Sequence, residues 1–183
     1  VPYGLVSLDG EKLSTRNGNI IYAEDILREA IRRAEAAVLE KNPHLENKDE
    51  VARMVGVGAV TFHDLYNQRI KNINFSWKEA LSFDGSTAPY VQYTYARAKS
   101  VLRRHGKAVN PDLADCSLLA DSVSYSLVKI LGGYEDAVRS AADKYEPSIV
   151  ARYVMSLAVA FNKFYHDCAI LKAEENVRQA RLA

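Results

Sequence analysis

Residues 83–104 constrain the fold most, because they carry the signals that begin a helix and continue it. Pro89 suits the first turn of a helix, where its missing N–H costs nothing and its φ is already helical. Thr87 can cap that turn by accepting a hydrogen bond from an unpaired backbone N–H. From Tyr90 onward, Tyr, Ala, Ser and Val or Leu residues recur at helical spacing. The sequence therefore predicts a long helix that begins near Pro89.

The charge pattern of this helix is unusual. Residues 85–111 contain no Asp or Glu, whereas they contain Arg97, Lys99, Arg103, Arg104 and Lys107. Aromatic rings stack on bases and guanidinium groups pair with phosphates, so tyrosines interleaved with cations suit an RNA surface. The competing interpretation is a core helix with packed tyrosines and solvated cations, and composition alone favours it.

The rest of the chain is also predicted to be mainly helical. Helices are expected over residues 24–41, 49–70, 115–131 and 134–145. A last long helix begins at Pro147, and its apolar residues form a seam typical of a bundle core: Val150, Val154, Leu157, Phe161, Phe164, Cys168 and Leu171. Residues 1–8 indicate a strand or extended segment before a turn at Asp9-Gly10. The predicted fold is a mainly α helical bundle preceded by a short extended segment and a loop.

The helix over residues 49–70 contains the run Gly56-Val57-Gly58. This run does not continue into a dinucleotide-binding fingerprint, because residue 61 is Thr and the preceding segment is an acidic helix rather than a strand. Close approach of another helix is the expected role of the glycines. The inner side of this helix is predicted to be Val51, Met54, Val55, Gly58, Phe62 and Leu65.

Composition and residue spacing limit how the chain could bind RNA, a metal or a membrane. The 183 residues carry a net charge of +1, so any RNA binding has to come from local patches. Cys116 and Cys168 are far apart, which favours reduced thiols over a disulfide or a zinc site. The histidines lack metal-ligand spacing, so we expect no metal site. No apolar run is long enough to span a bilayer, and we expect no membrane partner.

The two ends of the chain indicate an excised piece of a longer protein. The sequence opens on Val1-Pro2 without a Met and stops at Ala183 inside a helical pattern.

Two segments carry a resemblance to a known family. Residues 83–97 read Phe-Asp-Gly-Ser-Thr-Ala-Pro-Tyr-Val-Gln-Tyr-Thr-Tyr-Ala-Arg, and residues 12–16 read Lys-Leu-Ser-Thr-Arg. Together they resemble arginyl-tRNA synthetase, a class I aminoacyl-tRNA synthetase, from its KMSKS loop into its helical anticodon-binding domain. Ala88 is a departure, since relatives usually have Gly there. The resemblance implies two parts: residues 1–72 as the end of the catalytic domain, and residues 73–183 as a truncated anticodon-binding domain.

The resemblance also implies an activity for the whole enzyme. Such an enzyme activates arginine with ATP and Mg²⁺ and transfers it to tRNA(Arg), in the cytoplasm and as a monomer. Lys12, Ser14 and Arg16 would contact the ATP phosphates, because mobile cations and donors offset the charge that develops on the leaving pyrophosphate. Thr15 stands where the family has its second loop lysine. Without the nucleotide-binding domain, these residues alone are expected to be inactive.

The segment over residues 146–171 resembles the anticodon-binding helix of the family. Its candidate RNA contacts are Arg152, Tyr153, Asn162, Lys163, Tyr165 and His166, which join Arg97, Lys99, Arg103 and Arg104. The alternative function is a stand-alone helical RNA-binding or protein-interaction module without catalysis. A KMSKS-like loop argues against a pure binding module, and the acid-free basic stretch argues against a module that contacts only proteins.

Overall fold

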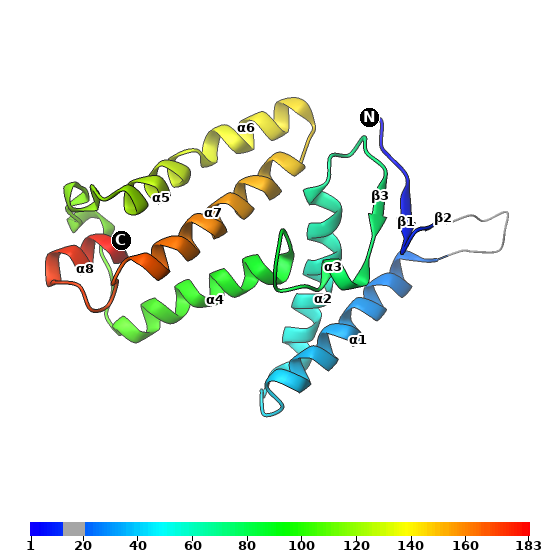
Figure 1. Ribbon diagram of the computed structural model, residues 1–183, viewed down its shortest axis with the longest axis horizontal. Coiled ribbons are helices and arrows are strands. Elements are labelled where there is room, and N and C mark those ends of the chain that lie inside the picture. The colour runs from blue at the N-terminus through cyan, green and yellow to red at the C-terminus, as the bar shows by residue number, and fades with distance from the viewer. Residues whose placement is uncertain (13–20) are drawn as a thin grey trace.

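The structure is a computed structural model that describes residues 1–12 and 21–183. Its N-terminal part consists of a small sheet, β1 (Val6–Leu8), β2 (Glu11–Lys12) and β3 (Ile73–Phe75), with helices α1 (Ala23–Lys41), α2 (Lys48–Tyr66) and α3 (Trp77–Ala80). The second part is helical: α4 (Ala88–His105), the short 3₁₀ turns η2 (Pro111–Leu113) and η3 (Cys116–Leu119), α5 (Ser122–Gly132), α6 (Tyr134–Lys144), α7 (Ser148–Asp167) and α8 (Glu175–Leu182). The predicted mainly α fold class is confirmed (Figure 1).

The helices α1 and α2 form a hairpin whose contact is made by small residues. Ala30 and Ala34 of α1 and Ala52, Gly56 and Ala59 of α2 are the buried residues of this pair. Their short side chains let the two backbones approach closely. A methyl group on Gly56 would lie 2.7 Å from the Ile31 Cα atom. The expectation of close helix approach is thus confirmed at Gly56.

Two predictions about α2 are wrong. The helix ends at Tyr66 and not at residue 70, because Asn67 is extended, with φ of −81° and ψ of 148°. The predicted inner side was chosen for its large apolar residues, yet Met54 and Leu65 are 53% and 40% exposed. The neighbouring helix packs instead on the stripe of small residues, which a search for large apolar side chains overlooks.

The three strands are arranged in the order β2–β1–β3. β1 and β2 pair in antiparallel register, Ser7 opposite Lys12, through the predicted turn, where Asp9 and Gly10 have φ values of 47° and 88°. β1 and β3 pair in parallel register, and α1 and α2 form the connection between them. Phe75 and Trp77 then pack on Ala30 and Ala80, with their ring centroids 5.0 Å apart. The extended N-terminal segment is therefore fixed by residues far along the chain.

The helix α4 begins as the sequence predicts. The Thr87 hydroxyl accepts a hydrogen bond from the Tyr90 N–H at 3.3 Å, and Pro89 lies in the first turn. The Thr87 hydroxyl also donates to the Ser82 carbonyl at 2.6 Å, which fixes the preceding loop. The helix ends at His105 and is capped by Gly106, whose φ of 70° is a left-handed conformation that glycine adopts at little cost.

The predicted helix over residues 115–131 is wrong in its first part. The chain forms the turn η3 there, and α5 begins only at Ser122. Asp121 causes the break, because its Oδ1 atom accepts hydrogen bonds from the N–H groups of Val123 and Ser124 and so caps α5. The Ser124 hydroxyl donates to Oδ2 of the same carboxylate at 2.6 Å.

The helix α7 lies between α4 on one side and α5 and α6 on the other (Figure 1). It ends at Asp167, so the predicted helix does not continue to residue 171, and Cys168 is extended. Phe164 of the predicted seam is buried, and Leu157 and Phe161 pack against the same core. A second stripe was missed: Ser148, Ala151, Met155 and Ala158 are also buried. A helix with neighbours on both sides needs two such stripes.

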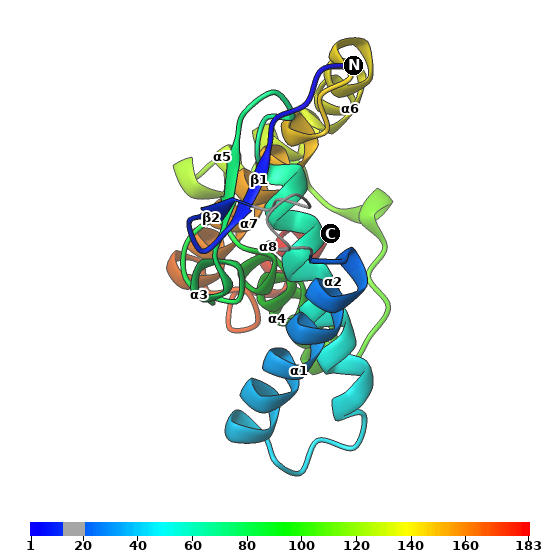
Figure 2. The ribbon, with the colours of Figure 1, turned by 90° about the vertical axis from the view of Figure 1, so that its right-hand side faces the viewer.

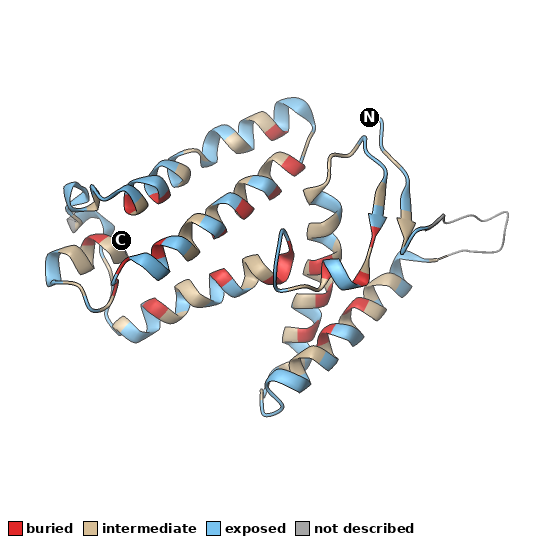
Figure 3. Ribbon diagram, viewed as in Figure 1, coloured by how far each residue is buried: buried red, intermediate tan, exposed pale blue. Residues whose placement is uncertain are grey.

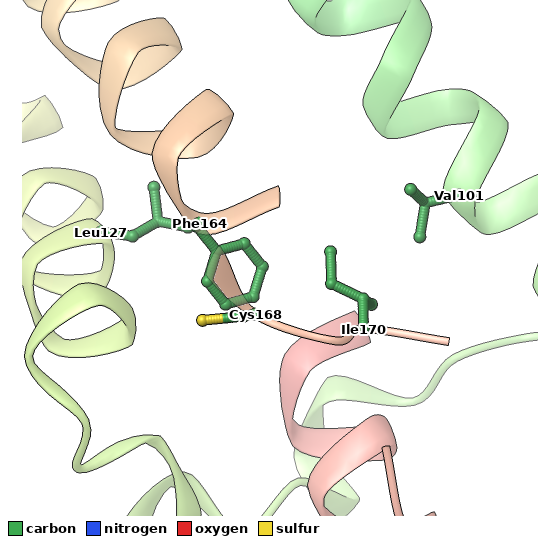
Figure 4. Close-up of a cluster of buried hydrophobic side chains, with 5 residues drawn as sticks. All are labelled: Val101, Leu127, Phe164, Cys168 and Ile170. Carbon is green, nitrogen blue, oxygen red and sulfur yellow. The ribbon is translucent and has the colours of Figure 1, made fainter. Parts of the chain in front are cut away.

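The core of the helical part gathers side chains from three helices and the segment after α7. Val101 of α4, Leu127 of α5 and Phe164 of α7 pack together with Cys168 and Ile170 (Figure 4). Buried residues follow the facing sides of the helices, while the outer sides are exposed (Figure 3). Within residues 1–12 and 21–183, no helix combines the length and the apolar character needed to cross a membrane.

The close approach at Gly56 gives a first prediction. Gly56→Ala should lower the free energy of unfolding by about 2–3 kcal/mol, because the added methyl group overlaps backbone atoms of α1 and the helices have to separate. Urea unfolding followed by circular dichroism measures this change. Gly132→Ala is the matched control: a methyl group at Gly132 meets nothing within 4 Å. Equal stability of the Gly56 variant and wild type would contradict the packing described.

The cap at Asp121 gives a second prediction. Hydrogen bonds from Ser124, first from its side chain and then from its backbone, lower the pKa of Asp121. Since the folded pKa is below the unfolded value of about 3.9, the carboxylate stabilises the fold above that pH, and this stabilisation disappears as pH falls through the folded pKa. Asp121→Ala should lower the free energy of unfolding by about 1 kcal/mol at neutral pH, as measured in urea melts.

Asp121→Asn removes the charge but keeps the cap, because the Asn side-chain oxygen can still accept the hydrogen bonds from the Val123 and Ser124 N–H groups. The stability difference between wild type and this variant should shrink as the pH of the urea melts is lowered from about 5 to about 3. A difference that stays constant over this range would show that the Asp121 carboxylate contributes no charge-dependent stability.

Candidate RNA-binding groove

A groove of about 630 Å³ lies between α4 and the C-terminal end of α7. Its floor is the core of the helical part, including Val101, Cys168 and Ile170. Four of the candidate RNA-binding residues line it, together with Tyr93: Arg97, Arg104, Tyr165 and His166. The packing of α4 against α7 thus brings residues that are far apart in the sequence to one surface.

Arg97 is the most constrained cation of the groove. Its guanidinium carbon lies 4.7 Å from the centroid of the Tyr93 ring and 4.8 Å from that of Tyr165. One guanidinium nitrogen donates to the Asn162 side-chain oxygen and another donates to the Tyr93 hydroxyl at 3.2 Å. Each cation–π contact contributes about 0.5–1 kcal/mol at a partly exposed site. Arg97 therefore joins α4 to α7 as well as lining the groove.

Asn162 extends this contact into the space between the helices. Its side-chain N–H donates to the Thr94 hydroxyl at 2.7 Å, and that hydroxyl donates to the Tyr90 carbonyl at 2.9 Å. Thr94 is only 6% exposed. The Asn162 amide thus has both of its ends engaged with α4, so its main structural effect is to set the width of the groove.

Arg103 and Arg104 occupy the last turn of α4 and are exposed. Among the described residues, neither of them forms an ion pair with an Asp or Glu. Cations at a helix C-terminus interact favourably with the unpaired carbonyl groups, by about 0.3–1 kcal/mol each. Their charges remain available to a phosphate, because a helix end neutralises a cation only in part.

Asp167 is the groove residue that sequence reasoning missed. Its carboxylate lies 2.5 Å from the Lys163 ammonium and 2.8 Å from the His166 Nδ1 atom. The hydrogen bond from Lys163, and then that from His166, lower the pKa of Asp167, while Asp167 raises the pKa of Lys163. The spacing of Lys163 and Asp167 was a visible signal, since residues four apart meet on a helix. Lys163 is therefore paired with an acid.

Other candidate residues lie away from the groove. Lys99 approaches the Tyr95 ring, 5.7 Å from its centroid, and neither residue lines the groove. Arg152 lies above the Tyr66 ring of α2, at 5.7 Å. The Tyr153 hydroxyl donates to the Leu131 carbonyl at 3.3 Å. Arg152 and Tyr153 precede Asn162 by about ten residues, which is roughly 15 Å along α7.

The candidate ATP-binding residues are only partly described. Lys12 is the last residue of β2 and pairs with Ser7 of β1, whereas Ser14 and Arg16 lie outside the described residues. Within the described part of the chain, no group of three or more His, Cys, Asp or Glu residues could hold a metal ion.

Two family models match the chain. The model described as the DALR anticodon binding domain matches residues 91–183. The model described as the class I (R) tRNA synthetase catalytic domain matches residues 1–77. The first match contains the helices that form the groove, and the second contains the sheet, α1 and α2.

Individual proteins agree with these matches. The chain is 48% identical to the arginine–tRNA ligase of Halothermothrix orenii and 50% identical to that of Clostridium botulinum strain 657, in both cases over 100% of this chain and 32% of the relative. It therefore spans about a third of the length of these relatives. Among solved structures, Thermus thermophilus arginyl-tRNA synthetase matches with a TM-score of 0.88 at 38% identity, covering 98% of this chain and 30% of that one.

The arginyl-tRNA synthetase of Plasmodium falciparum has the same fold, with a TM-score of 0.79 at 20% identity over 100% of this chain and 30% of that one. The resemblance that residues 83–97 carry is confirmed by the relatives, which match along the whole chain. Because the model of the anticodon-binding helices matches half of its residues, the chain belongs to the DALR anticodon binding domain family.

Proposed function

We propose that this chain is part of an arginine–tRNA ligase and that it supplies tRNA binding and the mobile loop of the ATP site. The observation that carries the proposal is the similarity of 48–50% identity along the full chain to enzymes of that name. The whole enzyme would join arginine to ATP, release pyrophosphate and transfer the arginyl group to tRNA(Arg). We further propose that it acts in the cytoplasm as a monomer.

The groove between α4 and α7 is the proposed RNA site. Arg104 is exposed and bears the charge that a phosphate requires, and Tyr165 and His166 offer ring faces on which unstacked bases can pack. Arg97 and Asn162 shape the groove through their contacts with each other. Asp167 would repel a phosphate, so the backbone of the RNA should pass on the Arg104 side of the groove. Further outer contacts are proposed at Lys99, Arg103, Arg152, Tyr153 and Lys163.

Lys12, Ser14 and Arg16 are proposed to contact the ATP phosphates in the whole enzyme. ATP, bound with Mg²⁺, would supply the reacting phosphates. The residues of this chain would offset the negative charge that develops on the departing pyrophosphate. The pairing of β1 with β2 supports this role, because it places the Lys12 backbone in a paired strand beside β1.

The chain divides, in this proposal, into an end piece of the catalytic domain and an anticodon-binding domain. Sequence reasoning sets the boundary between residues 72 and 73. The pairing of β3 with β1 and the packing of Trp77 on Ala30 support a boundary after α3 instead. The loop over residues 82–87 would then connect the two functional parts.

RNA binding by the basic end of α4 is testable on the chain itself. A double variant, Arg103→Ala/Arg104→Ala, should bind the anticodon stem-loop of tRNA(Arg) more weakly and with a flatter salt dependence. Removing one phosphate contact lowers the log–log slope by about 0.7–0.9, so the slope should fall by roughly 1.4–1.8 if each arginine contacts one phosphate. Filter binding between about 50 and 200 mM salt measures both quantities.

Lys129→Ala/Arg139→Ala is the matched control for this experiment. It removes the same two charges from exposed positions on α5 and α6, outside the groove. Thermal melts check that all proteins are folded. If both double variants bind the stem-loop as tightly as wild type does, and with the same log–log salt slope, then Arg103 and Arg104 do not contact the RNA and are only solvated.

The role of Lys12 is testable in the whole enzyme that contains this chain. Lys12→Ala should raise the barrier to arginine activation by about 2–4 kcal/mol and leave the KM for arginine nearly unchanged, because its interaction with pyrophosphate forms mainly in the transition state. The measurement is arginine-dependent ATP–pyrophosphate exchange in the presence of tRNA. An unchanged kcat with a raised KM for arginine would exclude the proposed role, and Lys129→Ala on α5 serves as the control.

A further inference from the structure

A pocket of about 680 Å³ lies between the α1–α2 hairpin and the first half of α4. We call it the apolar pocket, because aliphatic and aromatic side chains form most of its lining. Its walls come from α1, from the first half of α2 and from the chain over residues 81–96. The turn between α1 and α2 projects from the body of the molecule in Figure 1 and again in Figure 2, which is turned by 90°. The last residues of α1 therefore lie at the outer end of the pocket.

The apolar pocket differs from the RNA-binding groove, although both border α4. Of the described residues, Tyr93 and Ala96 alone line both. Around the apolar pocket, Met54, Tyr93 and Tyr95 are 53%, 54% and 64% exposed, and Phe83 is also exposed. Single exposed apolar side chains are ordinary on a protein surface, whereas several of them around one concavity mark a site for another molecule.

The charges at the apolar pocket all have one sign. Arg33 and Lys41 line it, and no Asp or Glu does so among the described residues. Arg33 is already bound to Glu29 at 2.7 Å. The Lys41 ammonium lies 4.2 Å from the centroid of the Phe83 ring, and within residues 1–12 and 21–183 no acid forms an ion pair with it. Lys41 therefore offers a positive charge beside an apolar surface, and the end of α1 offsets that charge only in part.

The size and lining of the pocket select the class of occupant. Sites for small molecules are usually pockets of about 300–1,000 Å³ with apolar walls and a few polar groups. Phe83, Tyr93 and Tyr95 provide rings on which another aromatic ring packs favourably. An anionic group on the same molecule would pair with Lys41, beside the Asn42 side chain, which also lines the pocket. Walls on three sides suit a compact molecule better than a long helix.

We propose that the apolar pocket is a binding site for a small aromatic acid, whose rings lie between α1 and α4 and whose anionic group pairs with Lys41. This site goes beyond the proposed function, since neither ATP nor RNA is assigned to this pocket. Its test therefore needs no RNA and no catalytic activity.

The two methionines of the chain can locate a bound probe. Met54 lines the apolar pocket, whereas Met155 is buried in α7 and does not. The probe is anilinonaphthalene sulfonate, which combines aromatic rings with one anionic group. In a chain with isotope-labelled methionine methyl groups, a nuclear magnetic resonance titration should shift the Met54 signal until it saturates and leave the Met155 signal in place. An unmoved Met54 signal, or equal shifts of both signals, would overturn the proposal.

A second, neutral probe tests the role of Lys41. Phenylnaphthylamine has the same rings without the sulfonate. Lys41→Ala should weaken binding of the sulfonate probe about threefold to fivefold, the effect of losing one partly exposed charge pair, and should leave binding of the neutral probe unchanged. Fluorescence titrations measure both affinities. A Lys41→Ala chain that binds both probes as wild type does would contradict the proposed pairing.

Two further variants complete this comparison. Met54→Glu places an acid at the edge of the apolar pocket, and should weaken binding of the sulfonate probe more than that of the neutral probe. Lys129→Ala removes an exposed cation on α5, outside the pocket, and should bind both probes as wild type does. Thermal melts check folding, and Lys41→Gln replaces Lys41→Ala if that variant does not fold.

The longer protein that contains this chain supplies the last arm. Lys41→Glu in that protein should weaken binding of the sulfonate probe relative to Lys129→Glu, which changes the net charge by the same amount. Equal binding by these two variants would overturn the proposed ligand site, because it would show that other parts of the longer protein cover the apolar pocket.

Discussion

The attachment of α4 on two sides is the constraint on which the rest of the structure depends. On one side, the Gln92 amide donates to the Met54 carbonyl of α2 at 3.0 Å, in a space that exists because Gly58 has no side chain. On the other side, Thr94 and Arg97 bind Asn162 of α7. One helix thus contacts both the sheet-containing part and the helical part, and Arg152 of α7, above the Tyr66 ring of α2, adds a second connection between them. The width of the groove follows from the hydrogen bonds of Thr94 and Arg97 with Asn162.

Much of this fold could be predicted from the sequence, because its helix ends carry local signals. Thr87, Pro89 and Gly106 mark α4 through interactions within a few residues. The predicted buried side of α2 was wrong because packing between helices determines which side of a helix is buried. The buried side of α2 is a stripe of small residues, and its importance appears only when α1 lies against it. The break before α5 had a local signal in Asp121 and Ser124, which the apolar pattern of the surrounding residues concealed.

The candidate site was predictable to a smaller degree. Four of the candidate RNA-binding residues on α4 and α7 line one groove: Arg97, Arg104, Tyr165 and His166. The sequence could not indicate how their polar groups are already used. Asn162 bridges two helices and Lys163 binds Asp167, so each has a structural partner before any RNA arrives. Such partnerships depend on side-chain geometry across helices, and spacing along one helix reveals only those that lie within it.

The parallel pairing of β1 with β3 has a consequence for the order of folding. Leu8 and Phe75 are neighbours in the sheet, and the hydrogen-bonded residues Ser7 and Ile73 of the same strands are 66 positions apart in the sequence. Closing so long a loop costs entropy that local contacts cannot offset, whereas the α1–α2 hairpin forms from residues close in sequence. The α1–α2 hairpin shortens the effective loop between β1 and β3, because it brings the two ends of that loop together. We therefore expect the sheet to complete after the helices between its strands have packed, so that β1 gains its support from β3 late.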